Sequence, residues 1–445
     1  MTSACYGVIS FYFVREGINK MLELKKILNN YKDVFLLGVV AVIIGIVIGA
    51  IDTIFGKVLL HVTNIRNNYT YQIVPFLPLA GVLIVFAYLK IGKNSIKGMS
   101  LIFSVRFKEE DTIPLRLVPL AMVGTWLTHL FGGSAGREGV AVQIGGTVAH
   151  SIGRRFSIKD SSKILLVTGM AAGFAGLFQT PIAAIFFAME VFIAGSVEYC
   201  ALFPCILASF AASYTSRALS LNEPGINLNC LLDFNVYLFL KVVFLGIIFG
   251  VIGGIFAYTF NMSKKFFNKR ISNPILRVFI MGCLLSVLFL LLHRGRYSGS
   301  GLNLIEAAFY NGEIYPYDWL LKFILTILTM SVGFQGGEIV PLFSIGASLG
   351  AVISPIFGLP NEFVSAIGYV AIFGSATNTI LAPVFIGGEI FGYNYLPYFF
   401  VVSAIAYVFN GNKSIYSSQR ILNDFSLFDR KVISVKKNKL LHRMN

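Results

Sequence analysis

The chain has 445 residues, of which 56% are hydrophobic and only 13% are charged. Soluble globular proteins carry roughly 25% charged residues, so this composition argues against a soluble enzyme. The formal net charge of +15 is typical of a membrane protein with basic cytoplasmic loops, because the basic residues form no amphipathic or low-complexity patch. The composition therefore predicts a polytopic membrane protein embedded in a lipid bilayer, with no nucleic-acid partner.

Apolar runs long enough to cross a hydrocarbon core of about 30 Å recur along the chain. Residues 36–44 are apolar on every face, which favours helices over the alternating strands of a β-barrel. Helices, some of them broken or tilted at Gly and Pro, are predicted over residues 34–60, 74–92, 115–131, 163–194, 198–218, 236–260, 275–293, 317–333, 341–357, 364–392 and 396–410. Basic residues precede the first span and follow the last, so both termini are predicted to be cytoplasmic.

Three pairs of segments indicate an internal repeat. Gly98 and Gly299 begin similar Gly/Ser segments, and residues 140–145 and 341–346 both end in Ile-Gly; each pair is 201 residues apart. A third pair, around Pro181 and Pro383, keeps nearly the same spacing. Three matches in one order predict two structurally similar halves. Odd numbers of spans in each half would leave both termini on one side, which favours inverted over parallel repeats.

The predicted organisation has four parts. An N-terminal cytoplasmic extension covers residues 1–33, the first membrane repeat 34–225 and the second 226–420, with a polar break at residues 222–225. Residues 421–445 form a basic cytoplasmic tail that is too short for a regulatory domain. The N-terminus lacks the basic region and cleavage site of a signal peptide, and translation from Met21 stays open beside translation from Met1.

Residues 132–140 form a Gly-rich turn that leads into an apolar helix. Free amides at such a helix start can bind an anion, and duplicated transporters place such helix ends between their repeats. Glu138 lies at this helix start within apolar sequence, so its carboxylate is suited to fill an empty anion site and leave it on protonation. One alternative stays open, in which Arg137 and Glu138 cap the helix or pair with each other. Neighbours on a helix do not face one another, which weakens the pairing version.

The sequence resembles the CLC family of anion channels and proton-coupled antiporters from about residue 34 to 420. The family's G-R-E-G-P motif appears as Gly-Arg-Glu-Gly-Val at residues 136–140, and its G-x-F-x-P motif as Gly-Glu-Ile-Val-Pro at residues 337–341. Its G-S-G-I-P motif appears only as Gly-Met-Ser-Leu-Ile at residues 98–102, and its late tyrosine matches Tyr416. The resemblance implies an all-α polytopic fold of two inverted repeats with broken, tilted helices, assembled as a homodimer.

Departures from these motifs resemble the fluoride-transporting CLC-F subclass. Met99 stands where chloride-carrying members have a serine, Val140 replaces a proline, and Ile339 replaces a phenylalanine. Glu338 matches a glutamate that is implicated in proton coupling in that subclass. The internal proton glutamate of chloride/proton antiporters is missing, because Val191 occupies its position, so coupling needs another acid.

The resemblance implies a proton-coupled fluoride exporter in the plasma membrane that gives resistance to fluoride and needs no cofactor. A chloride/proton antiporter or a passive anion channel of the same family is the alternative. Glu138 and Glu338 would then gate the pathway and couple protons to it. The anion pathway would include backbone amides near Glu138 and Ile339 and the Tyr416 hydroxyl, and its residues would be Met99, Gly139, Val140, Ile339, Val340 and Tyr416.

Structural roles stay open for these residues. Met99 could pack in a helical core, Tyr416 could anchor the chain at the membrane interface, and Glu338 could pair with a buried cation such as Lys322. Glu190 and Glu389 are further intramembrane acids, and their places at helix ends favour a structural role.

An intramembrane enzyme is the rival from a different class. The Ser-Gly-Ser-Gly segment at residues 298–301 faintly resembles the active-site serine of rhomboid-like proteases, but the internal repeat aligns it with a segment that has no nucleophile. The chain contains no H-E-x-x-H or G-x-G-D motif. Its five histidines and five cysteines show no metal-ligand spacing, so neither an enzyme nor a metal site is expected.

Overall fold

The fold is that of a computed structural model, which describes residues 2–221, 225, 226, 228, 230, 235–310, 312–423 and 431–434. The predicted all-α membrane fold is confirmed, since nearly all of the regular structure in these residues is helical. The predicted break at residues 222–224 and most of the basic tail lie outside the described residues.

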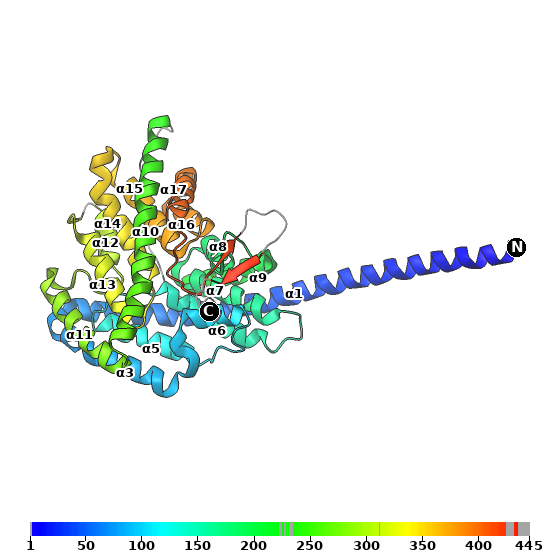
Figure 1. The fold of residues 1–445 in the computed structure, drawn as a ribbon, viewed down its shortest axis with the longest axis horizontal. Coiled ribbons are helices and arrows are strands. Elements are labelled where there is room, and N and C mark those ends of the chain that lie inside the picture. The colour runs from blue at the N-terminus through cyan, green and yellow to red at the C-terminus, as the bar shows by residue number, and fades with distance from the viewer. Residues whose placement is uncertain are drawn as a thin grey trace, which may run out of the picture.

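The first half of the chain forms nine α-helices joined by short 3-10 turns at Val74–Phe76, Lys93–Lys97 and Tyr199–Ala201. These helices are α1 (Thr2–Asn68), α2 (Thr70–Ile73), α3 (Leu77–Ile91), α4 (Met99–Arg106), α5 (Leu117–Leu130), α6 (Glu138–Gly153), α7 (Ser161–Phe178), α8 (Pro181–Glu190) and α9 (Leu202–Ala218). In Figure 1 the N-terminal part of α1 projects far from the other helices, so the predicted extension continues directly into the first span as one helix.

The second half contains eight further helices, with 3-10 turns at His293–Gly295 and Tyr393–Tyr395. They are α10 (Val236–Arg270), α11 (Pro274–Leu291), α12 (Leu302–Phe309), α13 (Asp318–Val332), α14 (Ile339–Phe357), α15 (Asn361–Thr377), α16 (Leu381–Phe391) and α17 (Leu396–Val408). The series α4 to α9 in the first half recurs in the same order as α12 to α17. In the view of Figure 1, α5 and α6 of the first series lie low in the molecule and α15 and α17 of the second lie high.

Seven helical stretches in the described residues are long and apolar enough to cross a membrane. They are Tyr31–Asn68, Thr70–Ile91, Ser161–Phe178, Tyr199–Ala218, Val236–Arg270, Pro274–Leu291 and Ile339–Phe357. Three apolar helices, α5, α8 and α16, are shorter. Helices of 10 to 14 residues such as these are too short to span a hydrocarbon core of about 30 Å, so their ends lie within the protein.

Two of the predicted helices are each divided in the structure. The predicted helix 163–194 consists of α7 and α8, because Gln179 adopts a left-handed conformation (φ +58°) and Pro181 starts the next helix at its first position. The predicted helix 364–392 is divided in the same way at Asn378, which also has φ +58°. The short helices α4 and α12, of eight residues each, were not predicted from the sequence.

Glycines allow corresponding helix pairs to pack closely in the two halves. A Cβ atom on Gly145 of α6 would overlap the carbonyl of Gly169 in α7, and one on Gly346 of α14 would overlap that of Gly368 in α15. Gly145 and Gly346 end the two Ile-Gly segments found by the repeat search. The repeat therefore preserves the contacts that hold α6 on α7 and α14 on α15.

A small sheet ties the end of the membrane region to α8. It has the order β1-β2-β3, built from β1 (Ile193–Ala194), β2 (Arg420–Asn423) and β3 (Lys431–Ser434). β1 pairs with β2 in parallel and β2 with β3 antiparallel. The predicted boundary between the second repeat and the tail, at residue 420, therefore falls inside a strand.

Candidate ion pathway

The two Gly-rich loops of the sequence motifs meet in the structure. The Gly136 amide donates to the Gly337 carbonyl at 2.6 Å, and the Gly337 amide donates back to the Gly136 carbonyl at 2.8 Å. Helix α6 begins two residues after Gly136, and α14 begins two residues after Gly337. The N-terminal ends of both helices, which carry partial positive charge, therefore lie beside each other.

Glu138 is fully buried at the first position of α6. The Arg137 side chain donates a hydrogen bond to its carboxylate through Nε at 3.1 Å, and the Arg137 backbone amide donates at 3.2 Å. The expectation that helical geometry disfavours this pair is wrong, because Arg137 is the N-cap residue (φ −130°, ψ −26°) and lies outside the helix. The carboxylate is therefore held against the start of α6 by its own neighbour.

Two cavities approach this meeting point. The first, which we call the Met99 cavity, has a volume of about 410 Å³ and is lined by residues that include Met99, Gln143, Glu338 and Tyr416. The second, the Arg137 cavity, has a volume of about 860 Å³ and a wall that includes Arg137. The two cavities share no lining residue; Glu338, beside one loop, lines the first and Arg137 of the other loop lines the second, so the paired loops lie between them.

The predicted pathway residues differ in their access to the Met99 cavity. Met99 lies on its wall, half-buried as the first residue of α4. Tyr416 is only 8% exposed and its ring stacks on Phe103 at 5.6 Å, which does not fit an anchor at the membrane interface. Its hydroxyl has no hydrogen-bond partner among the described residues. Tyr416 therefore has a donor available for a ligand in this cavity.

The backbone amides at the two helix starts are not all available to an anion. The Val140 amide donates to the Arg137 carbonyl at 3.0 Å within the first turn of α6, which corrects its predicted role as a donor. The amides of Gly139, Ile339 and Val340 donate no hydrogen bond among the described contacts. Because such first-turn amides lack helical partners, these three amides remain candidates for binding an anion.

Glu338 is half-buried on the wall of the Met99 cavity, close to the start of α6. A pairing with Lys322 is excluded, because the Lys322 ammonium donates to Ser134 Oγ at 2.9 Å and to the carbonyls of Gly299 at 2.7 Å and Tyr297 at 3.2 Å. Lys264 lines the same cavity as Glu338 and is the cation whose charge acts on that carboxyl group. Sequence reasoning missed Lys264 because it ended the predicted helix at residue 260, whereas α10 continues to Arg270.

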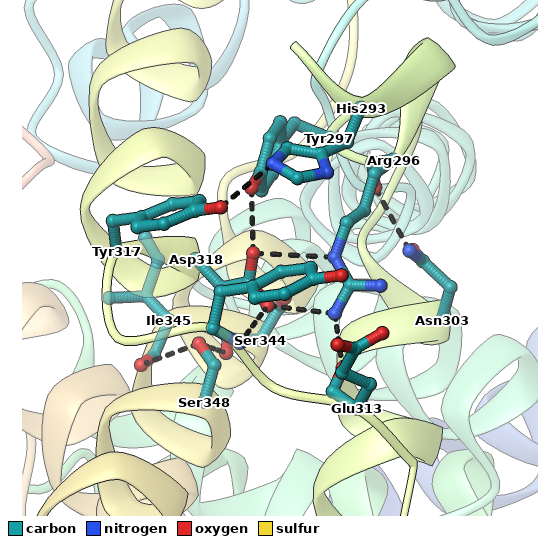
Figure 2. Close-up of polar contacts among 11 residues, drawn as sticks. His293, Arg296, Tyr297, Asn303, Glu313, Tyr317, Asp318, Ser344, Ile345 and Ser348 are labelled. Atoms are coloured by element: carbon teal, nitrogen blue, oxygen red, sulfur yellow. Dashed lines mark hydrogen bonds and ion pairs between the residues drawn. The ribbon is translucent and has the colours of Figure 1, made fainter.

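A polar cluster supports the loop that faces the first Gly-rich motif. Figure 2 shows Asp318, at the start of α13, bonded to the Arg296 guanidinium at 2.7 Å and to the Tyr297 hydroxyl at 2.6 Å. The next residues along the chain reach Gly299, whose carbonyl accepts from the Ala135 amide at 3.1 Å. The segment at residues 298–301 thus pairs with the loop that carries Glu138.

A duplicated helical fold whose paired helix ends separate two cavities defines a membrane ion transporter. The chain belongs to the CLC family: residues 80–411 match the family described as voltage gated chloride channel. It is 33% identical over 386 residues to a chloride/fluoride channel protein of Pseudomonas syringae pv. tomato, covering 85% of each chain. It is 27% identical over 352 residues to the H(+)/Cl(-) exchange transporter ClcA of Citrobacter koseri, covering 74% of this chain and 73% of the relative.

Solved structures agree with this assignment. The crystal structure of a CLC-type fluoride/proton antiporter superposes with a TM-score of 0.86 at 49% identity, covering 88% of this chain and 99% of that one. A slow cyanobacterial Cl-/H+ antiporter superposes with a TM-score of 0.75 at 20% identity, covering 86% of this chain and 96% of that one. The second match shows the shared fold alone.

Proposed function

We propose that the protein exports fluoride from the cytoplasm in exchange for protons, and that it acts as a transporter and not as an enzyme. The observation that carries this proposal is the buried Glu138 carboxylate at the first position of α6, where the N-termini of α6 and α14 lie beside each other. A carboxylate in that place competes with an anion for the same positive potential. Similarity to a fluoride/proton antiporter at 49% identity supports the choice of ions.

Exchange follows from the charge of Glu138. While ionised, the carboxylate is held by Arg137 at 3.1 Å and blocks the passage between the Met99 and Arg137 cavities. Protonation removes the charge that attracts it to Arg137 and to the start of α6, so the side chain leaves and an anion takes its place. When an anion reaches this point, the proton must be bound; when the proton leaves, the carboxylate returns and displaces the anion.

The lining of the Met99 cavity supports fluoride as the anion. Fluoride is small and strongly hydrated, so it needs short contacts to strong donors, such as the unpartnered Tyr416 hydroxyl. Met99 presents a thioether in place of the hydroxyl that chloride-carrying relatives use, which removes one contact suited to the larger ion. The chloride/proton alternative is supported by the ClcA relatives at 27% identity.

The assembly and orientation are part of the proposal. A homodimer in the plasma membrane with both termini cytoplasmic fits the family resemblance and the basic segments at both ends of the chain. In that orientation the exported fluoride crosses from the cytoplasm to the outside while protons move inward.

Flux from proteoliposomes tests the proposed function. Fluoride and chloride efflux are measured with ion-selective electrodes, with and without a pH gradient, for the wild type and for Glu138→Gln. We expect fluoride efflux well above chloride efflux, acceleration by an inward proton gradient, and loss of that acceleration in Glu138→Gln. Glu109→Gln, at a surface loop, serves as the control and should behave as the wild type. Equal chloride and fluoride fluxes would favour the chloride alternative, and coupled flux through Glu138→Gln would remove Glu138 from the mechanism.

A further inference from the structure

Three cationic side chains line the Met99 cavity, and two of them are already engaged. Lys97 forms an ion pair with Glu110 at 2.5 Å, and Arg277 donates to the carbonyls of Val332 and Ile271 at 3.2 and 3.3 Å. The third is Lys264, which has no ion pair or hydrogen bond among the described contacts.

Lys264 is placed by α10 and by an aromatic ring. Its ammonium lies 3.9 Å from the centre of the Phe260 ring, one turn earlier on the same helix. A cation–π contact of this kind orients an ammonium without using its hydrogen-bond donors. Lys264 therefore keeps N–H donors that no described group uses, and it lines the cavity.

Lys264 and Glu338 attract each other across the cavity without forming an ion pair in the described contacts. The Tyr416 hydroxyl, which is buried and unpartnered, also lies within the electrostatic reach of Glu338. The Lys264 ammonium, the Glu338 carboxyl group and the Tyr416 hydroxyl therefore belong to residues that line one cavity, and no described hydrogen bond joins them. A cationic donor and a buried, unpartnered phenol on one cavity wall are groups that can bind an anion through short hydrogen bonds.

We propose that a fluoride ion binds between Lys264, Tyr416 and Glu338, with Lys264 as its counter-cation and the protonated Glu338 carboxyl as a hydrogen-bond donor. The proposal rests on the proposed fluoride transport and adds Lys264 to the residues that bind the anion. Ammonium, phenol and carboxylic acid donors give the short, strong hydrogen bonds that a small anion requires. An ionised Glu338 would repel the anion and compete with it for Lys264, so fluoride binding and protonation of Glu338 favour each other.

Because of this linkage, fluoride affinity should depend on pH, and the dependence can be assigned to a particular residue. Glu338 is the only acidic side chain on the described wall of the Met99 cavity. The other titratable groups on that wall are bases or phenols, namely Tyr88, Lys97, Lys264, Arg277 and Tyr416. Groups of these types ordinarily titrate above pH 9, so a proton taken up by this wall between pH 5 and 8 as fluoride binds belongs to Glu338. Glu138, which lies off this wall, takes up a proton of its own in the proposed exchange, and variants of the two acids distinguish the two contributions.

Isothermal titration of sodium fluoride into the full-length protein in detergent tests the proposal. For the wild type we expect the affinity to rise as the pH falls from 8 to 5, approaching tenfold per pH unit where one proton is taken up with each fluoride. Lys264→Met should weaken binding by about tenfold or more at every pH, whereas Lys264→Arg, which keeps the charge, should retain most of it. Glu338→Gln, whose amide still donates, should lose the part of the pH dependence that Glu338 causes, whereas Glu138→Gln should keep that part.

Lys265→Met is the matched control, because Lys265 is the next residue of α10, is exposed, and lies off the cavity wall. The inference would be overturned if Lys264→Met bound fluoride with wild-type affinity, or if the affinity of the wild type did not change with pH. Fluoride/proton exchange by the wild type in liposomes would still stand in that case. Absence of fluoride flux from wild-type liposomes, with chloride flux present, would instead overturn the proposed function itself.

Discussion

Glu190 and Glu389 each cap the helix that carries the other. The Glu190 carboxylate, at the end of α8, accepts hydrogen bonds of 2.7 to 3.3 Å from three amides at the start of α16. The Glu389 carboxylate, near the end of α16, accepts bonds of 3.0 and 2.9 Å from two amides at the start of α8. The rings of Phe186 and Phe385 stack between these helices at 4.6 Å. The two acids thus satisfy buried helix ends reciprocally and lock the two halves of the chain together.

Removing either cap should destabilise the protein. Glu190→Gln and Glu389→Gln each replace a charged acceptor of buried amides by a weaker one, with an expected loss of about 1–3 kcal/mol. The double variant should lose less than the sum of the single losses, because each change already loosens the same helix pair. Thermal unfolding in detergent measures the effect, with Glu306→Gln, at an exposed position of α12, as the control. Single variants as stable as this control would show that the reciprocal bonds contribute nothing.

The fold was predictable from the sequence where helices are long and apolar. The predicted helix over 317–333 differs from α13 by one residue at each end. The divisions at Gln179 and Asn378 were not predicted, because the left-handed conformation of a single polar residue leaves no periodic signal. Helices α4 and α12 were missed because eight residues are too few to establish an apolar pattern.

The candidate site was predictable where motifs carry it. Glu138, Met99 and Glu338 lie in Gly-rich motifs, and the structure brings the last two to one cavity wall. Lys264 has no motif, and its place on the cavity wall depends on how far α10 extends. The reciprocal caps at Glu190 and Glu389 join residues 190 to 207 positions apart, and no local pattern in a single sequence indicates such a pairing.

Met99 should influence the choice of anion. Met99→Ser restores a hydroxyl donor at the start of α4, on the wall of the Met99 cavity, and a larger anion would gain a contact there. We expect chloride efflux to rise relative to fluoride efflux in proteoliposomes, by about two- to tenfold for one added hydrogen bond. Met262→Ser, on the exposed face of α10, is the matched control. A flux ratio identical to that of the control would place selectivity elsewhere in the pathway.

Close packing in the two halves should be sensitive to a single methyl group. Gly145→Ala and Gly346→Ala each place a Cβ against an opposing backbone carbonyl, which cannot yield as a side chain can. Overpacking of this kind costs about 1–3 kcal/mol, and we expect both variants to unfold at lower temperature than the wild type. Gly225→Ala is the control, because a Cβ there meets no atom within 4 Å. If both variants melted at the wild-type temperature, the helices would accommodate the added methyl group at little cost in stability.

Lys322 should stabilise the loop that carries Glu138. Its ammonium joins Ser134 in that loop to the Gly299 and Tyr297 carbonyls of the second half, and it forms no ion pair among the described contacts. Lys322→Met replaces the ammonium by an unbranched apolar side chain one atom shorter and removes one donor from three buried oxygens, at an expected cost of about 2–3 kcal/mol. We expect a lower melting temperature and, because the Glu138 loop loses its support, slower fluoride/proton exchange. Lys265→Met, which removes an exposed ammonium from α10, should change neither quantity. If the Lys322→Met protein melts at a lower temperature but exchanges ions normally, Lys322 contributes to stability alone. If the variant is as stable as the wild type, Lys322 does not support the loop.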